Sequence, residues 1–280
     1  MTRFLVIGIA IGVILLALVG WRIFDHVADR AEMVRLRHLQ PESPQRFGYD
    51  MISGLPDPAQ RFFRFSIAEG TTLRPVVDIQ MAGQFSLGDK KDPRDMAMHA
   101  TQVLAAPYGF VWKMRAQSGH LRLSGSDSGR WTRFWMGGLL PVVRAGGDPD
   151  HARSAFGRSV AEAVFWSPAA VLPSANVVWE HVDQDTARVT VSHEGLVQSI
   201  DLTVAANGQP TEVVFQRWSD ANADKVFRLQ PFGGYLSDFQ DVQGYRLPTR
   251  VEAGNHFGTD AYFPFYRVDV TAISFPTPDR

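Results

Sequence analysis

The sequence predicts a mainly β (α+β) fold, in which a single curled antiparallel sheet or half-barrel with covering helices follows an N-terminal transmembrane helix. Three observations lead to this prediction. A long run without charges lies near the first residue, about a dozen short segments alternate apolar and polar side chains, and one central segment has helical spacing. Strands and helices do not alternate along the chain, which argues against a doubly wound parallel sheet.

The N-terminal apolar run extends from Phe4 to Trp21. As a helix rising about 1.5 Å per residue, it spans roughly 27 Å, close to the about 30 Å of a bilayer's hydrocarbon core. A cleaved signal peptide is the alternative, but its apolar region holds about 7–15 residues and ends in a small-residue cleavage site. This run is longer and ends with Trp21 beside Arg22, which is typical of an uncleaved membrane anchor.

The chain divides into three regions. Residues 1–39 are the transmembrane anchor and a helical stalk, because residues 23–39 lack Gly and Pro and have charged faces that we expect in solvent or on lipid headgroups. Residues 40–54 contain two prolines and form a linker. Residues 55–280 form a single β-rich domain, which opens with a short helix that has proline in its first turn.

The β-rich domain contains two series of strand candidates. Each candidate is bounded by Gly, Pro, Asp or Asn, as the strands of an antiparallel meander are. Asn207 and Gly208 predict a tight hairpin between two of them, because both residue types tolerate positive φ. The first series lies at residues 77–85, 96–103, 109–115, 120–125 and 130–136, and the second at 176–182, 186–192, 196–205, 211–218, 225–231, 235–243, 247–255 and 262–275.

The segment 158–173, which reads R-S-V-A-E-A-V-F-W-S-P-A-A-V-L-P, separates the two series. Its helix starts after Asp148, a favourable N-cap residue, and ends before Pro168, because a residue that precedes proline resists helical geometry. A sheet of this length must curl, so we expect the helix to lie across its concave face. The expected inner face of this helix consists of Ala152, Ala155, Phe156, Val160, Ala163 and Val164.

Several functional classes have no support in the sequence. The net charge of −1 argues against a nucleic-acid partner, and the absence of cysteine excludes thiolate chemistry and Cys-ligated metals. The eight histidines do not form a zinc motif, and we expect no cofactor. Residues 125–129, Gly-Ser-Asp-Ser-Gly, have Asp where a serine hydrolase has its nucleophile, and we interpret them as a hairpin turn.

Arg158 and Glu162 are the charged pair that merits a functional hypothesis. Spaced i, i+4, they meet on one helix face, where a structural ion pair is favoured over catalysis. If the helix covers a curled sheet, one of them could point inward and meet Arg217 or a strand carboxylate. Tryptophans on the strands and helix belong to the core or line a pocket. The candidate ligand or structural-core residues are Arg158, Glu162, Trp166, Trp179, Arg217 and Trp112.

Several motifs that keep their order along the chain carry a family resemblance. They are L-P-D-P-A-Q-R-F (55–62), P-Y-G-F-V-W (107–112), R-x-x-x-E-x-x-x-W-x-P-x-x-x-L-P (158–173), P-F-G-G (231–234) and G-Y-R-L-P (244–248). Over most of residues 50–275 the chain resembles a bacterial family of uncharacterised, membrane-anchored proteins known only as a domain of unknown function. More weakly, the strand-rich body is similar to the half-barrel of lipoprotein carriers of the LolA/LolB type, which hold acyl chains between sheet and helices. The chain departs from those carriers in its membrane span and its lack of a lipobox Cys.

These observations lead to a ranked set of functional hypotheses. The first is a membrane-anchored, non-enzymatic protein that binds a lipid or other amphiphile in a hydrophobic cavity. The alternatives are a hydrolase or isomerase that uses a partly buried Glu/Arg pair, and a structural module of an envelope complex. The carrier resemblance implies a single pass through the bacterial inner membrane with an extracytoplasmic body, whereas the four arginines that follow the span predict the opposite orientation.

Overall fold

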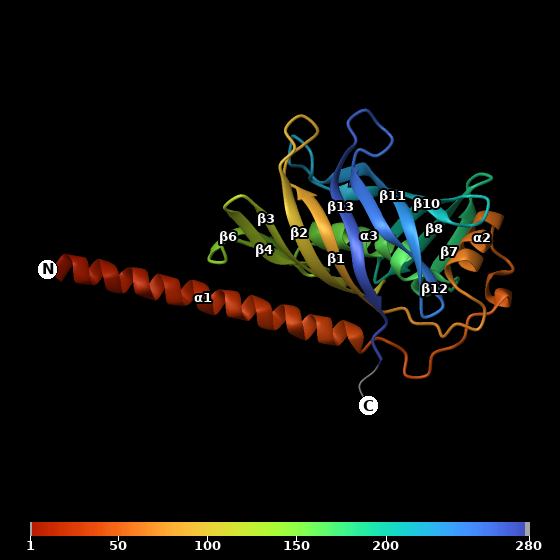
Figure 1. The fold of residues 1–280 in the computed structure, drawn as a ribbon, viewed down its shortest axis with the longest axis horizontal. Coiled ribbons are helices and arrows are strands. Elements are labelled where there is room, and N and C mark those ends of the chain that lie inside the picture. The colour runs from red at the N-terminus through yellow and green to blue at the C-terminus, as the bar shows by residue number, and fades with distance from the viewer. Residues whose placement is uncertain (1, 278–280) are drawn as a thin grey trace.

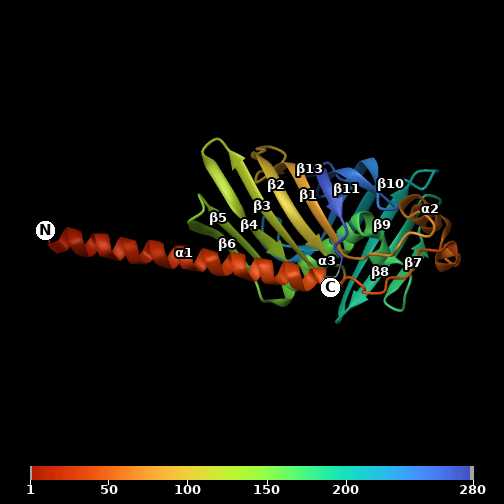
Figure 2. The same ribbon diagram turned by 60° about the horizontal axis from the view of Figure 1, so that its bottom comes forward.

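The body of the protein is one antiparallel sheet, seen in a computed structural model that describes residues 2–277 (Figures 1 and 2). The described residues form thirteen strands in the order β6-β5-β4-β3-β2-β1-β13-β12-β11-β10-β9-β8-β7. The sheet curls without closing, so β6 (Leu140–Gly146) and β7 (Val177–His181) are its two edges. The predicted fold class, a curled antiparallel sheet with covering helices behind a long apolar helix, is therefore confirmed.

The sheet consists of two meanders that meet at its centre. Successive strands pair as hairpins, and β1 (Val77–Ser86) pairs with β13 (Phe263–Ser274) to join the first meander to the second. The other strands of the first meander are β2 (Asp95–Leu104), β3 (Phe110–Ser118), β4 (Leu121–Ser128) and β5 (Trp131–Met136). Those of the second are β8 (Thr186–His193), β9 (Leu196–Val204), β10 (Pro210–Ser219), β11 (Arg228–Val242) and β12 (Tyr245–Asn255).

Helix α3 (Pro149–Trp166) connects the two edges of the sheet and therefore has to cross it. Figure 1 shows that it runs within the concave side of the curl. The helix begins as expected, because the Asp148 carboxylate accepts a hydrogen bond from the backbone N–H of His151 at 2.8 Å. It ends at Trp166, since Ser167 before Pro168 leaves helical geometry with φ −139° and ψ 61°.

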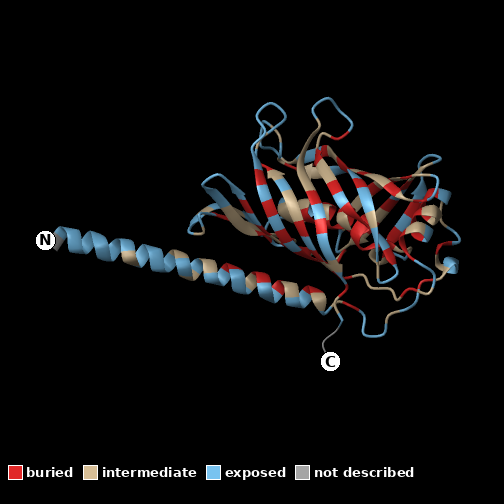
Figure 3. Cartoon of the chain, viewed as in Figure 1, coloured by how far each residue is buried: buried red, intermediate tan, exposed pale blue. Residues whose placement is uncertain are grey.

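The main core fills the space between α3 and the concave face of the sheet. Burial alternates along the strands, as expected for a sheet with one packed face (Figure 3). Along β2, for example, Met96, Met98 and Ala100 are buried and the residues between them are exposed. Helix α2 (Asp57–Ser66) closes the core at the β7–β8 end, where Phe62 and Phe63 are completely buried.

The N-terminal helix α1 (Thr2–Arg37) has two different halves. Its first half extends away from the body, and its second half lies along the outer face of the sheet (Figures 1 and 2). Asp25, Asp29 and Glu32 are buried there, so the expectation that the charged faces of residues 23–39 are solvated or on headgroups is wrong for this face of the helix. The hydrophobic pattern of the sequence did not predict this buried face, because three of its buried side chains are carboxylates.

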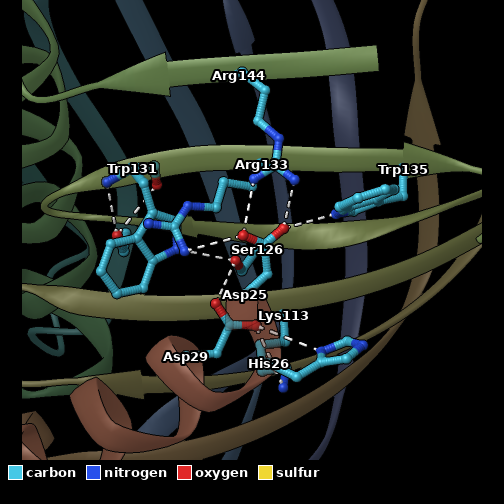
Figure 4. A network of polar contacts seen from close by, with 10 residues as sticks. Asp25, His26, Asp29, Lys113, Ser126, Trp131, Arg133, Trp135 and Arg144 are labelled. Carbon is cyan, nitrogen blue, oxygen red and sulfur yellow. Dashed lines mark hydrogen bonds and ion pairs between the residues drawn. The ribbon is translucent and has the colours of Figure 1, made fainter. Parts of the chain in front are cut away.

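Polar contacts attach α1 to β3–β6 (Figure 4). The Asp25 carboxylate accepts hydrogen bonds from Arg144 at 2.6 and 2.9 Å and from the indole N–H of Trp135 at 2.8 Å. Asp29 accepts one from the Ser126 hydroxyl at 2.6 Å and lies 3.5 Å from the Lys113 ammonium. Near the end of the helix, the attachment becomes apolar: Leu36 packs in a small cluster with Val76, Val103, Ala105 and Val111.

Three strand predictions differ from the structure. Residues 225–231 and 235–243 were expected as two strands, but β11 runs unbroken through Gly233, where an added Cβ would lie 2.7 Å from the Phe257 ring. Gly233 leaves room for this aromatic ring, and Gly234 leaves room for the neighbouring strand at Ala253, so the pair does not form a turn. Residues 125–127 belong to strand β4, and the turn follows Ser128. Strand β6 was not predicted, because it is a short, exposed edge strand between glycine pairs.

Candidate functional site

A cavity of about 310 Å³ lies between α3 and the concave face of the sheet. This volume is at the lower end of the range, about 300–1,000 Å³, in which small-molecule sites fall. Its wall is dominated by aromatic and aliphatic side chains from α3 and from both meanders. The apolar members are Phe85, Trp112, Phe134, Ala155, Ala161, Phe165, Trp166, Val213, Phe215, Phe232, Leu236, Val251, Ala253 and Phe265.

The strand register explains why these side chains share one wall. On β10, Val213, Phe215 and Arg217 are two residues apart and therefore point to the same side of the sheet. Phe215 packs against Phe232 of β11 with ring centroids 5.3 Å apart. The second meander thus contributes an aromatic wall to the cavity, and Arg217 lies at the end of this wall.

A buried ionic cluster occupies the α3 side of the cavity. The Arg158 guanidinium donates to Glu162 Oε1 and to Asp127 Oδ2, each at 2.7 Å, and to Gln102 Oε1 at 3.3 Å. Gln102 in turn donates to Glu162 Oε2 at 2.5 Å. The side chains of Arg158, Asp127 and Glu162 are only 17%, 19% and 12% exposed. Both carboxylate oxygens of Glu162 are therefore occupied by hydrogen bonds within the protein.

Neighbouring charges stabilise the cationic form of Arg158. Burial alone would lower the pKa of Arg158, but the neighbouring charges of Glu162 and Asp127 outweigh it and raise that pKa. The phenol of Tyr266, which also lines the cavity, has its pKa raised by burial and by the Glu162 charge. Tyr266 is therefore a neutral hydroxyl at physiological pH, and Arg158 is a permanent cation with two counter-charges.

Arg217 is in a different situation on the opposite wall. Among the described residues, no carboxylate lies within 4.0 Å of its guanidinium, and its buried Nε–H has no hydrogen-bond partner. Its guanidinium carbon lies 5.0 Å from the centre of the Phe232 ring. Burial, and then the positive charge of Arg158, lower the pKa of Arg217.

The structure brings five of the six sequence-derived candidates together. Trp112, Arg158, Glu162, Trp166 and Arg217 all line the cavity, and Trp166 also donates its indole N–H to the backbone oxygen of Pro248 at 3.2 Å. Trp179 does not line it. It packs against Phe63 of α2 at a ring-centroid distance of 5.4 Å and donates to the Val171 carbonyl at 2.9 Å, so it is a core residue.

Sequence reasoning missed Asp127, Gln102 and Tyr266. Asp127 was assigned to a turn, although it sits on β4 directly opposite Trp112 in the strand register. Had the strand been extended to Ser128, that pairing would have placed Asp127 on the cavity face. Gln102 and Tyr266 carried no signal, because each is a polar residue in an ordinary alternating strand. Within residues 2–277, no three His, Cys, Asp or Glu side chains are grouped to hold a metal ion.

The fold and the site define an unclosed, curled β-sheet protein with an aromatic cavity beneath a crossing helix. The chain belongs to a family of unknown function, DUF6544, whose model matches residues 45–268. This confirms the resemblance to an uncharacterised family that the motifs predicted. A search among functionally curated proteins found no match.

Solved structures that are similar to this chain include three bacterial proteins. A LolA superfamily protein from Nitrosomonas europaea is 10% identical and has a TM-score of 0.39, over 78% of this chain and 91% of that chain. A putative outer membrane lipoprotein-sorting protein domain from Vibrio parahaemolyticus is 11% identical with a TM-score of 0.39, over 83% and 94%. A DUF1329 family protein from Desulfovibrio piger is 10% identical with a TM-score of 0.39, over 81% and 91%. Two of these three are described as LolA superfamily or lipoprotein-sorting proteins.

Proposed function

We propose that this protein is a membrane-anchored, non-enzymatic binding protein that holds a lipid or other amphiphile between α3 and the sheet. The observation that carries the proposal is the cavity of about 310 Å³, whose wall is mostly aromatic and aliphatic. Apolar surface of this kind, with a few polar groups among it, is typical of sites that bury a small apolar ligand. The polar groups come from the Arg158 cluster and from Arg217.

The anchor is the second part of the proposal. Helix α1 is long and apolar enough to cross a membrane, and residues 4–21 are its uncharged part. In this proposal, residues 1–39 are the anchor and stalk, residues 40–54 the linker and residues 55–280 the binding domain. The anchor crosses the bacterial inner membrane once, and the body is extracytoplasmic. Alkaline phosphatase and fluorescent-protein fusions at the C-terminus test this orientation, because each reporter is active on only one side.

A structural role for the Glu162–Arg158 pair fits the geometry better than acid–base catalysis. A general base needs a lone pair that can reach a substrate proton. Both oxygens of Glu162 accept hydrogen bonds from Arg158 and Gln102, at 2.7 and 2.5 Å. The carboxylate is therefore engaged in holding Arg158 in place, which supports the binding function.

Native mass spectrometry of the full chain, released from detergent micelles, tests the binding function. We expect a bound amphiphile in the wild type and its loss in Ala161→Phe, which places a ring in the cavity. Ala152→Phe on the same helix is the matched control, because Ala152 does not line the cavity. Thermal melts establish that both variants are folded. An empty wild type after exposure to fatty acids, phospholipids and lipopeptides would contradict the proposal.

A further inference from the structure

Arg217 is a partly buried cation that makes no ion pair with any carboxylate among residues 2–277. It lies at the end of the aromatic wall formed by Phe215 and Phe232, and its Nε–H is buried without a hydrogen-bond partner. A guanidinium removed from water loses solvation that only an anion or several hydrogen bonds can restore. The protein therefore presents a partly desolvated guanidinium without an ion-pair partner to an apolar cavity.

The nearest carboxylates do not supply the missing charge. Asp127 and Glu162 are both bound to Arg158 at 2.7 Å, so the two negative charges of the cavity are committed to the other arginine. Burial, and then the nearby charge of Arg158, lower the pKa of Arg217, while Asp127, Glu162 and Asp220 act in the opposite direction. Since these carboxylates act on Arg217 only from a distance, an anionic ligand could pair with it directly.

We propose that Arg217 binds the anionic end group, a carboxylate or a phosphate, of an amphiphile whose apolar chain lies along Phe215, Phe232 and Phe265. This inference rests on the proposed lipid-binding function and names the chemical class of its ligand. The planar guanidinium can donate two parallel hydrogen bonds to either group, and burial strengthens them. An uncharged amphiphile of the same length would leave the arginine unsatisfied.

The test compares three probes of equal chain length, a fatty acid, an alkyl phosphate and a fatty alcohol, on the full chain in neutral-lipid nanodiscs. Arg217→Met removes the charge and keeps much of the side-chain volume, and Arg153→Met changes an exposed arginine of α3 outside the cavity. We expect Arg217→Met to weaken binding of the anionic probes about 10- to 100-fold, from the loss of charged hydrogen bonds. Binding of the alcohol should change less than about twofold. Arg217→Lys should retain part of the preference for anionic over uncharged probes. Whichever of the fatty acid and the alkyl phosphate binds more tightly to the wild type identifies the end group.

Two results would overturn the inference in distinguishable ways. If wild type binds the alcohol as tightly as both anionic probes, or if Arg217→Met weakens all three equally, the cavity binds amphiphiles but Arg217 does not select anions. If none of the three probes binds to the wild type, the proposed function fails together with the inference.

A second inference follows from the position of α1 on the outer face of the sheet. At the end of the apolar run, the Trp21 ring packs on Trp135 with centroids 5.8 Å apart. Arg22 donates to the Ser124 hydroxyl at 3.0 Å, and the Arg144 guanidinium lies 4.5 Å from the Trp21 ring centre. If residues 4–21 span the membrane, these contacts place Ser124 and Trp135 at the level of the lipid headgroups.

The hairpin tips extend from that level towards the bilayer. Strand β4 contacts Asp29 through Ser126 and Arg22 through Ser124, so its earlier residues point towards the N-terminus of α1. Leu121 is three residues further along, at most about 10 Å when the strand is fully extended. Figures 1 and 2 show the tips of the β3–β4 and β5–β6 hairpins on the side of the body towards which α1 projects.

The composition of these tips suits a membrane surface. The two hairpins expose large apolar side chains, and Arg122 is an exposed cation beside them. Apolar and basic side chains together favour the headgroup region of a bilayer with anionic lipids. The exposed apolar residues are Leu121, Met136, Leu139, Leu140, Val142 and Val143.

We infer that the β3–β4 and β5–β6 hairpin tips rest in the headgroup layer of the membrane leaflet from which α1 emerges. The body then has one fixed orientation on the bilayer and does not swing on a flexible stalk. This inference depends on the proposed membrane span and is independent of the cavity.

Single-cysteine labelling tests the contact, since the natural chain has no cysteine. A polarity-sensitive dye is placed at Leu140→Cys, at Gly12→Cys within α1, and at Leu87→Cys on the β1–β2 loop, which lies away from α1 in Figure 1. The full chain is reconstituted in liposomes that contain an anionic lipid and headgroup- or chain-labelled quenchers.

We expect chain quenchers to act on the Gly12 dye and headgroup quenchers to act on the Leu140 dye. Headgroup quenching at Leu140 should exceed that at Leu87 at least about threefold, because such quenching requires contact at the bilayer surface. Equal quenching at Leu140 and Leu87, with Gly12 quenched, overturns the hairpin contact alone. An unquenched Gly12 dye shows that α1 does not span, and then both the anchor and the contact are wrong.

Discussion

The two faces of the sheet each carry a cluster of arginines and carboxylates, and the clusters differ in their surroundings. On the outer face, Asp25 of α1 lies between Arg133 and Arg144, and the Nε of Arg144 is buried without a hydrogen-bond partner in the described chain. On the inner face, Arg158 of α3 is matched by two carboxylates, and Arg217 is left over next to a cavity. The same chemistry therefore attaches a helix on one side and presents an unpaired guanidinium to a cavity on the other.

This difference separates a structural cluster from a candidate binding site. Buried ion pairs contribute little net stability compared with apolar residues of the same size, but removal of one partner is costly. Matched clusters thus fix geometry, and an unmatched charge in a cavity is a reason to expect a ligand. Substitutions that remove one charge from a cluster, or restore its charge balance, can test whether that cluster is structural.

The largest effect is expected from Arg158→Met. This change leaves Asp127 and Glu162 as buried carboxylates without their shared cation, and it should lower the free energy of unfolding by about 3–5 kcal/mol. Chemical denaturation of the full chain measures this loss. Adding Glu162→Gln and Asp127→Asn removes the uncompensated charges and should recover part of the stability. If the single variant is as stable as the wild type, the cluster on the inner face is not electrostatically coupled.

Asp25→Asn should have a smaller and more local effect. It removes the charge that Arg144 and Trp135 bind and should weaken the attachment of α1 by about 1–3 kcal/mol, without unfolding the sheet. Hydrogen exchange of residues 21–37 should accelerate, whereas that of β12 should not change. Arg30→Gln is the matched control, because Arg30 is exposed on the same helix. Faster exchange throughout the sheet would show that the two faces are not separable.

The attachment of α1 should also depend on pH. Burial opposes ionisation of Asp25, but hydrogen bonds from Arg144 and Trp135 outweigh it and lower the pKa of that carboxyl. A lowered carboxyl pKa stabilises the folded state above the ordinary value of about 3.9, and this contribution disappears as the pH falls through the lowered pKa. Exchange of residues 21–37, corrected for the intrinsic rate, should therefore be unchanged between about pH 5 and 7 and should increase below about pH 4.

A variant without the Asp25 carboxylate tests the origin of this pH dependence. Asp25→Asn should remove most of the acid-dependent step, and Glu32, whose pKa is lowered by hydrogen bonds from Arg35 against the effect of burial, accounts for the rest. Protection that is lost when the pH rises above 7 would contradict this assignment, because the sign of the linkage would be reversed.

The two faces also differ in how far the sequence predicts them. Period-two alternation and turn residues predicted the sheet, and the Asp148 and Pro168 signals predicted both ends of α3, because these features depend on neighbouring residues. The i, i+4 spacing of Arg158 and Glu162 predicted their pairing. Asp127 and Gln102 could not be assigned to them, because their contact with α3 depends on how the whole sheet curls. The attachment of Asp25 to Arg144 could not be predicted either, because these residues are far apart in the chain. In addition, a charged face of a helix is normally exposed to solvent.

The smallest of these effects is expected at the start of α3. Asp148→Ala removes the hydrogen bond from the Asp148 carboxylate to the His151 N–H, and an N-cap loss of this kind costs about 1 kcal/mol. Asp148→Asn should stay within a few tenths of the wild type, because Asn is an equally good N-cap residue. Since the cap is at the surface and the Arg158 cluster is buried, the two losses should add when combined. A loss at Asp148 as large as that of Arg158→Met would mean that the start of α3, instead of its buried cluster, controls how the helix sits in the sheet.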